Sequence, residues 1–259
     1  MGIHVIERPP LQPGPANGAV VVLVHGSMDR ASSFRRVIAR LPDFTVISYD
    51  RRGYAGSAEV PPASLFDRQV DDLVEVLGGR TVVGVGHSLG GDVVLAAAQR
   101  HRELIDTAMV FEPPQPWLRF WSERPSGSAA AIEVGRSSPP RAAEMFMRGM
   151  VGDGVWDRLS SSTQERRRAE GATLVAELQA LRSGRPVFDA ASITIPVVCG
   201  YGSKSRPHQK QGTRRLAEVV PLGELHCIEG STHGAHLSHP GAVATLIRRA
   251  LARREEPKP

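Results

Sequence analysis

Ser88 lies in the pentapeptide Gly86-His87-Ser88-Leu89-Gly90, between an apolar run and a stretch that favours helix. The run at residues 82–85 predicts a buried parallel strand, and residues 91–98 predict a helix. A nucleophile on such a sharp strand-to-helix turn needs small residues two positions before and two after it, which Gly86 and Gly90 supply. The spacing predicts a nucleophile elbow with the Ser88 hydroxyl at the positive end of the helix. The alternative is a glycine-rich turn in which Ser88 only caps the helix.

Two phosphate-binding interpretations of these glycines fail on residue type. A P-loop ends in Gly-Lys-Ser or Gly-Lys-Thr, and no lysine lies near residue 88. A dinucleotide-binding fingerprint requires glycine where this chain has Leu89. The segment therefore predicts nucleophilic chemistry and no nucleotide cofactor.

A serine hydroxyl is a poor nucleophile until a base removes its proton. The imidazoles considered as the base are His25, His87, His233, His236 and His239. The last three are spaced by three residues, which would allow a metal site, but no nearby carboxylate or thiolate pattern supports one. We expect neither a metal nor a cofactor.

Composition limits the classes of partner. The chain has 259 residues with 41% hydrophobic and 23% charged residues, enough for one large α/β domain. Its net charge of +5 comes from scattered arginine pairs and triples without interleaved aromatic residues, so no nucleic-acid partner is expected. No apolar run reaches the 18 or so residues of a membrane span, and the first residues lack the apolar core of a signal peptide. These features predict a cytoplasmic protein, a monomer or a homodimer.

Positioning Ser88 requires a sheet. Apolar strands are expected at residues 4–8, 19–24, 44–49, 82–85, 105–111, 196–200 and 224–228, with helices at 31–41, 66–77, 211–220 and 242–254. This alternation predicts a mostly parallel sheet with helices on both faces. Residues 113–191 interrupt it with helical segments, including 142–150 and 169–182. We therefore predict an α/β core over residues 1–112 and 192–259, with a helical insertion at 113–191 between its sixth and seventh core strands.

These motifs resemble the α/β-hydrolase family over nearly the whole chain. The resemblance rests on His25-Gly26 after a strand, the Asp50-x-Arg52-Gly53 loop, the elbow around Ser88, and Gly230-Ser-Thr-His233 with Pro240 seven residues later. Ala55 replaces the glycine usual in the loop after Gly53. The resemblance implies an α/β-hydrolase fold whose inserted helices act as a lid.

The resemblance also implies a triad in the order nucleophile, acid, base. His233 matches the base, because it follows the last strand and precedes the closing helix. Most relatives carry the acid in a Gly-x-x-Asp pattern, but the matching position here is Ser203. Some members carry the acid one strand earlier, where Glu112 stands before two prolines, so Glu112 is the predicted acid. The alternatives are a Glu112 that pairs with an arginine at the lid hinge, with Asp189 or Glu229 as the acid, or a Ser-His dyad.

Developing negative charge on the substrate needs two backbone N–H donors. The resemblance assigns them to Leu89, directly after the nucleophile, and to Ser27, after the early strand. The substrate pocket is expected to include His25, Trp117, Trp121 and Met147. Apolar residues of the lid suit a pocket and equally suit a small core that seats the lid.

The expected function is a serine hydrolase that cleaves a carboxylic ester, thioester or lactone with an apolar portion through a Ser-His-Glu triad. Perhydrolysis of the haloperoxidase type and C–C bond hydrolysis use the same triad and stay open. A third alternative is a ligand-binding protein on the hydrolase fold, since fold alone does not give activity.

Overall fold

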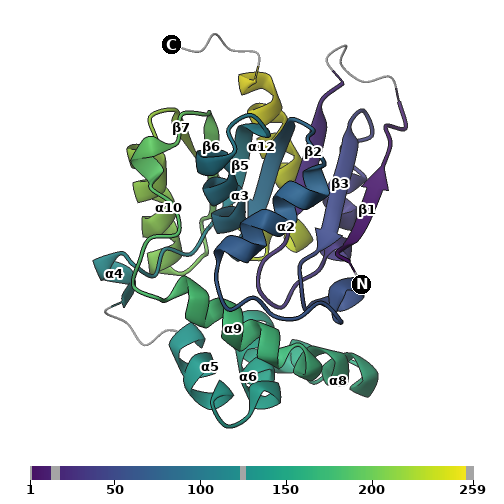
Figure 1. Ribbon diagram of the computed structural model, residues 1–259, viewed down its shortest axis with the longest axis vertical. Coiled ribbons are helices and arrows are strands. Elements are labelled where there is room, and N and C mark those ends of the chain that lie inside the picture. The colour runs from purple at the N-terminus through teal and green to yellow at the C-terminus, as the bar shows by residue number, and fades with distance from the viewer. Residues whose placement is uncertain (1, 13–17, 123–126, 255–259) are drawn as a thin grey trace.

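The computed structural model describes residues 2–12, 18–122 and 127–254, and it contains a seven-stranded sheet in the order β1-β3-β2-β4-β5-β6-β7 (Figure 1). Strand β1 pairs antiparallel with β3, and every other neighbouring pair is parallel. The strands are β1 (His4–Arg8), β2 (Val20–Val24), β3 (Thr45–Asp50), β4 (Val82–His87), β5 (Ile105–Phe111), β6 (Val197–Gly202) and β7 (Gly223–Ile228). The mostly parallel α/β sheet predicted from the sequence is confirmed.

Helices cover both faces of the sheet because the central strands are apolar on both sides (Figure 1). One face carries α2 (Asp67–Leu77), α3 (Leu89–Arg100) and α10 (Pro207–Val219). The other carries α12 (Pro240–Arg253) and the short helix α1 (Arg35–Ile38), which a 3-10 turn at Ala31–Phe34 precedes. The helix expected at residues 31–41 is therefore shorter and begins as a 3-10 turn.

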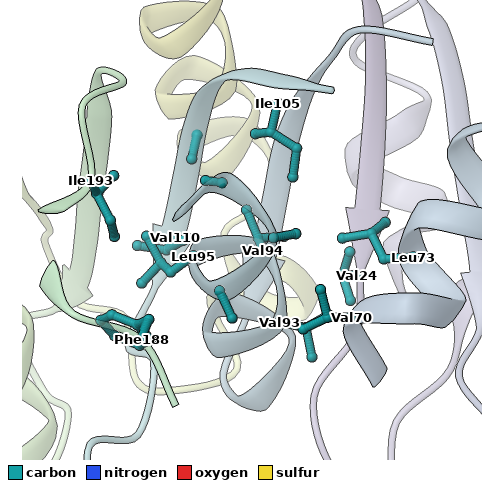
Figure 2. Close-up of a cluster of buried hydrophobic side chains, with 14 of the residues drawn as sticks. Val24, Val70, Leu73, Val93, Val94, Leu95, Ile105, Val110, Phe188 and Ile193 are labelled. Carbon is teal, nitrogen blue, oxygen red and sulfur yellow. The ribbon is translucent and has the colours of Figure 1, made fainter. Parts of the chain in front are cut away.

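The helix that follows the elbow lies at the centre of one face. Figure 2 shows Val93, Val94 and Leu95 of α3 packed among side chains of the sheet and of α2. Ten of the twelve residues of α3 are buried, so this helix is fixed along most of its length. The element that carries the elbow is therefore rigid.

Between β5 and β6 the chain forms a group of helices at one end of the sheet (Figure 1). They are α4 (Arg119–Ser122), α5 (Gly127–Gly135), α6 (Pro139–Val151), α7 (Asp153–Trp156), α8 (Ser161–Ala169) and α9 (Gly171–Leu181). The described residues contain five strands before this group and two after it. The helices are therefore inserted between the fifth and sixth strands, and not between a sixth and a seventh strand as expected. Residues 123–126 of the predicted insertion lie outside the described residues. The helix expected at 169–182 is not continuous. Helix α8 ends at Ala169, Glu170 separates the two helices, and α9 begins at Gly171.

The inserted helices have a small core of their own. Trp156 is fully buried in it, with Leu174 of α9 and Ala142 and Ala143 of α6. Met28 and Tyr54 from loops of the sheet join the same cluster, so it continues into the α/β core.

A buried ion pair also joins α9 to the sheet. The Arg51 guanidinium, directly after β3, donates to Glu177 Oε2 at 2.9 Å, and both side chains are nearly inaccessible to solvent. Tyr54 Oη donates to Glu177 Oε1 at 2.6 Å. Arg51 further donates to the carbonyl oxygens of His25 and Gly26. The same arginine therefore fixes α9 and the turn that follows β2.

Glu177→Ala should lower the free energy of unfolding by about 3–5 kcal/mol, because it leaves the Arg51 charge buried without its counter-ion. Urea denaturation of the purified variant measures the loss. The matched control is Glu133→Ala, which breaks the exposed Glu133–Arg136 pair of the same inserted region and should cost at most about 0.5 kcal/mol. Equal losses in the two variants would contradict an anchoring role for Glu177.

Within the described residues, none of the helices is both long and apolar enough to cross a membrane.

Candidate active site

Ser88 lies at the junction of β4 and α3. Its backbone has φ 53° and ψ −131°, a conformation that residues other than glycine rarely adopt. A Cβ at Gly86 would lie 2.4 Å from the Gly91 Cα, and one at Gly90 would lie 2.2 Å from the Val24 carbonyl oxygen. Neither position has room for a side chain. The turn expected from the glycine spacing is therefore present, and it brings β2, β4 and α3 into close contact.

The turn after β2 lies directly against Ser88. A Cβ added at Gly26 would come within 2.8 Å of the Ser88 Cβ, so this approach also depends on glycine. Ser27 and Leu89 line the same cavity as Ser88. Leu89 is the first residue of α3, so its amide has no acceptor within the helix.

Glu112 and His233, which are 121 positions apart in the sequence, form a hydrogen-bonded pair. The His233 Nδ1 lies 2.6 Å from Glu112 Oε2. The other carboxylate oxygen, Oε1, accepts from the Gly202 amide at the end of β6 at 2.8 Å. Glu112 is 1% exposed, so the carboxylate is held by both oxygens away from solvent. With Oε2 accepting, His233 carries its proton on Nδ1 and leaves the lone pair on Nε2.

The other carboxylates considered as the acid have different partners. Glu229 is exposed and accepts from the Ser203 hydroxyl at 2.9 Å. Asp189 caps the 3-10 turn at Ala190–Ser192 through the Ala191 amide. Ser203, at the position where most relatives have the acid, is adjacent to the Gly202 amide that Glu112 binds. The Glu112 side chain therefore reaches from β5 to the end of β6.

A cavity of about 520 Å³ opens above these residues. Its polar end contains Ser88, His233, Glu112, His87 and Ser27. Its apolar wall comes mainly from the inserted helices, with lining residues Trp121, Met145, Phe146, Met150, Leu178 and Leu181. The cavity therefore combines a polar group able to do chemistry with a largely apolar surface.

Three of the four side chains expected in the pocket do not line this cavity. His25 is fully buried beneath it: its Nδ1–H donates to the Gly26 carbonyl at 2.7 Å, and its Nε2 accepts from the Arg51 amide at 2.8 Å. Burial lowers the pKa of His25 to about 3, so it is a neutral structural residue. Trp117 packs edge-on against Phe188, 5.4 Å between ring centroids. Trp121 alone of the four lines the cavity.

The periodicity of α6 explains the place of Met147. Met145, Phe146, Gly149 and Met150 share the helix face that lines the cavity, whereas Met147 packs into the small core of the inserted helices. At 3.6 residues per turn, residues 145, 146, 149 and 150 fall on one side and residue 147 falls off it. The sequence places Met145, Phe146 and Met150, like Met147, among apolar residues of the insertion that suit either a pocket or a small core. The helical period, once aligned to the cavity, distinguishes the two faces.

His87 is the second imidazole beside the cavity. Its Nε2–H donates to the His233 carbonyl at 2.8 Å, and its ring centroid lies 4.7 Å from that of His233 and 4.2 Å from that of His236. Burial, with the nearby His236 and His233, lowers the pKa of His87 well below its usual value. His87 is thus neutral at neutral pH, with its proton on Nε2.

Comparison with known proteins identifies the family. The model of the Alpha/beta hydrolase family matches residues 21–246. "Esterase YbfF" of Escherichia coli (strain K12) is 25% identical over 246 residues, which cover 91% of this chain and 94% of that protein. The crystal structure of an alpha/beta hydrolase from Sphaerobacter thermophilus aligns with a TM-score of 0.66 at 25% identity and covers 96% of both chains. The enol-lactonase from Burkholderia xenovorans LB400 aligns with a TM-score of 0.73 at 17% identity over 96% of both chains. Together with the parallel sheet and the elbow, these matches show that the chain belongs to the alpha/beta hydrolase family.

Proposed function

We propose that this protein is a serine hydrolase that cleaves carboxylic esters, thioesters or lactones with an apolar portion through Ser88, His233 and Glu112. One observation carries the proposal: the buried Glu112 carboxylate holds His233 Nδ1 at 2.6 Å, in the cavity that Ser88 also lines. A buried carboxylate on Nδ1 orients an imidazole and stabilises its protonated form.

The mechanism follows from the roles of these groups. Ser88 Oγ attacks the carbonyl carbon while His233 Nε2 takes its proton, and the amides of Leu89 and Ser27 donate to the resulting oxyanion. The tetrahedral intermediate collapses, and His233 gives the proton to the leaving atom. This atom is the alcohol oxygen of an ester or lactone, or the thiol sulfur of a thioester. Water, deprotonated by His233, then attacks the acyl-enzyme and releases the acid and free Ser88.

The apolar wall suggests how the cavity selects its substrate. Phe146, Leu178 and Leu181 line it from α6 and α9, which matches an acyl or alkoxy chain and not a polar one. In this proposal the inserted helices 113–191 act as the lid that supplies this wall.

For p-nitrophenyl esters, kcat/KM should rise with acyl length from acetate to hexanoate. Each methylene buried in the cavity contributes about 0.8 kcal/mol, or up to about fourfold in kcat/KM. Phe146→Ala should flatten this slope, whereas Val155→Ala, a change at an exposed residue of α7, should leave it unchanged. A slope that is flat in the parent protein would contradict an apolar acyl site.

Two experiments separate ester hydrolysis from the alternatives, which are ligand binding without catalysis, perhydrolysis and C–C bond hydrolysis. One uses a serine-directed probe, and the other uses hydrogen peroxide as a second nucleophile. A fluorophosphonate should label the protein covalently if Ser88 is activated, and a protein that only binds ligands should stay unlabelled. Perhydrolysis and C–C bond hydrolysis would use the same labelled serine. Peroxyacid formation from acetate and hydrogen peroxide, at a rate above that of ester hydrolysis, would favour the former.

A further inference from the structure

Three side chains of the types that can bind a metal ion lie close together, and the proposed hydrolysis uses none of them. The group consists of His87 at the end of β4, Asp29 in the loop after β2, and His236 in α11 (Ala235–Ser238). A possible ligand atom from each side chain lies within 4.8 Å of the others. The three residues come from separate parts of the sequence, so only the fold brings them together.

Two ring nitrogens of this group, His87 Nδ1 and His236 Nδ1, lack protein partners among the described residues. His87 is 8% exposed and His236 is 4% exposed. Within the described part of the chain, His87 Nδ1 and both ring nitrogens of His236 are buried without a hydrogen bond. His236 Nε2 lies 3.1 Å from Asp29 Oδ2 and forms an ion pair with it, so these two groups already contact each other. Buried polar atoms without partners are costly, and a bound ion would satisfy His87 Nδ1 and one ring nitrogen of His236.

The protonation states suit a cation. His87 donates its Nε2 proton to the His233 carbonyl, so the unpartnered Nδ1 carries a lone pair. Such a hydrogen bond on the far nitrogen is the usual arrangement for a metal-binding histidine. Asp29 Oδ2 also accepts from the Ser33 hydroxyl at 3.0 Å, which orients the carboxylate.

We propose that Asp29, His87 and His236 bind one divalent first-row transition-metal ion, such as Zn²⁺ or Co²⁺. Two imidazoles and one carboxylate are a donor set that these ions prefer, whereas Mg²⁺ and Ca²⁺ prefer oxygen ligands alone.

The separations are compatible with such an ion. Ligands at about 2.0–2.1 Å from a tetrahedral ion lie roughly 3.3 Å apart. Asp29 and His236 already meet this value, and shifts of up to about 1.5 Å would bring in His87. Asp29 has a side chain that is 18% exposed, and His87 lines the large cavity, so two of the three side chains are not fully sealed from solvent.

The proposal differs from the metal triad that the sequence suggested and that we set aside. That triad was His233, His236 and His239. His233 is instead held by Glu112, and His239 Nδ1 lies 2.8 Å from the Ser238 hydroxyl. Because His87 donates to the backbone carbonyl of His233, an ion on His87 would also restrain the loop that carries His233.

Titration of the chelator-treated full chain with Co²⁺ tests the site directly. The parent protein should bind one Co²⁺ per chain and develop visible d–d absorption, which Zn²⁺ should abolish by displacement. His236→Ala and Asp29→Asn should each weaken Co²⁺ binding by at least about 10–100-fold. His239→Ala, which removes a neighbouring imidazole that is not part of the group, and Ser88→Ala should both bind Co²⁺ as the parent does.

Thermal unfolding gives a second readout that does not depend on activity. Zn²⁺ should raise the Tm of the parent protein and of Ser88→Ala, but not that of Asp29→Asn, because only an ion bound to the folded state stabilises it. Asp29→Asn preserves the size of the side chain, so it tests the site even if His236→Ala does not fold. Parent protein that takes up no Co²⁺ at millimolar concentration, or variants that bind it as the parent does, would overturn the proposal.

Discussion

Ser88→Ala should lower kcat by roughly 10³-fold or more and abolish labelling by a fluorophosphonate. The alanine methyl cannot attack a carbonyl, and no acyl-enzyme can form. The substitution keeps a Cβ at a residue with φ 53°, so the backbone of the elbow is no more strained than before. Esterase assays at equal protein concentration, with Tm as a check on folding, measure the effect.

Ser27→Ala is the matched control for this experiment. In the proposed mechanism Ser27 acts through its backbone N–H, which the substitution keeps, so kcat should stay within a few-fold of the parent value. A large loss in Ser27→Ala would show that its hydroxyl takes part. Turnover by Ser88→Ala at the parent rate would remove Ser88 from the mechanism altogether.

Glu112→Gln should reduce kcat by roughly 10²- to 10⁴-fold with little change in KM. Glutamine has the same shape, and its carbonyl oxygen can still accept from the Gly202 amide. Its NH₂ group would then face His233 Nδ1, which favours the wrong tautomer of the imidazole and gives no charge to stabilise its protonated form. Steady-state kinetics on a single p-nitrophenyl ester separate the two constants.

Glu229→Gln serves as the control for Glu112→Gln, because it neutralises an exposed carboxylate that also follows the carboxyl end of a parallel strand. Glu229 contacts Ser203 and not His233, so the variant should turn over like the parent. Adding Ser203→Asp to Glu112→Gln places an acid beside Gly202, where most relatives of this family have theirs, and should restore part of the rate. Parent-like turnover by Glu112→Gln would mean that the enzyme works as a Ser-His dyad or uses another acid.

The sequence by itself determined the elements whose signals are local. The apolar strand, the two glycines and the helix around Ser88 occupy about 20 consecutive residues, and their steric requirements act between near neighbours. The central strands were likewise predictable, because a strand that is buried on both faces is apolar throughout. The seven expected strands are all present, whereas several helix ends moved, since caps and 3-10 turns depend on contacts outside the helix.

Only the tertiary structure decided which distant residues meet. Sequence order and the family pattern predicted Glu112 as the acid that orients His233. The 2.6 Å contact between them also requires the end of β5 and the loop after β7 to lie at the same edge of the sheet. The same holds for Arg51 and Glu177, and for Asp29, His87 and His236, whose separations along the chain carry no local signal. The pocket was hardest to predict: His25, Trp117 and Met147 have suitable side chains, yet they point into the protein core. Residue type states what a side chain could do, but which face of its element meets the cavity is set by the packing of the whole chain.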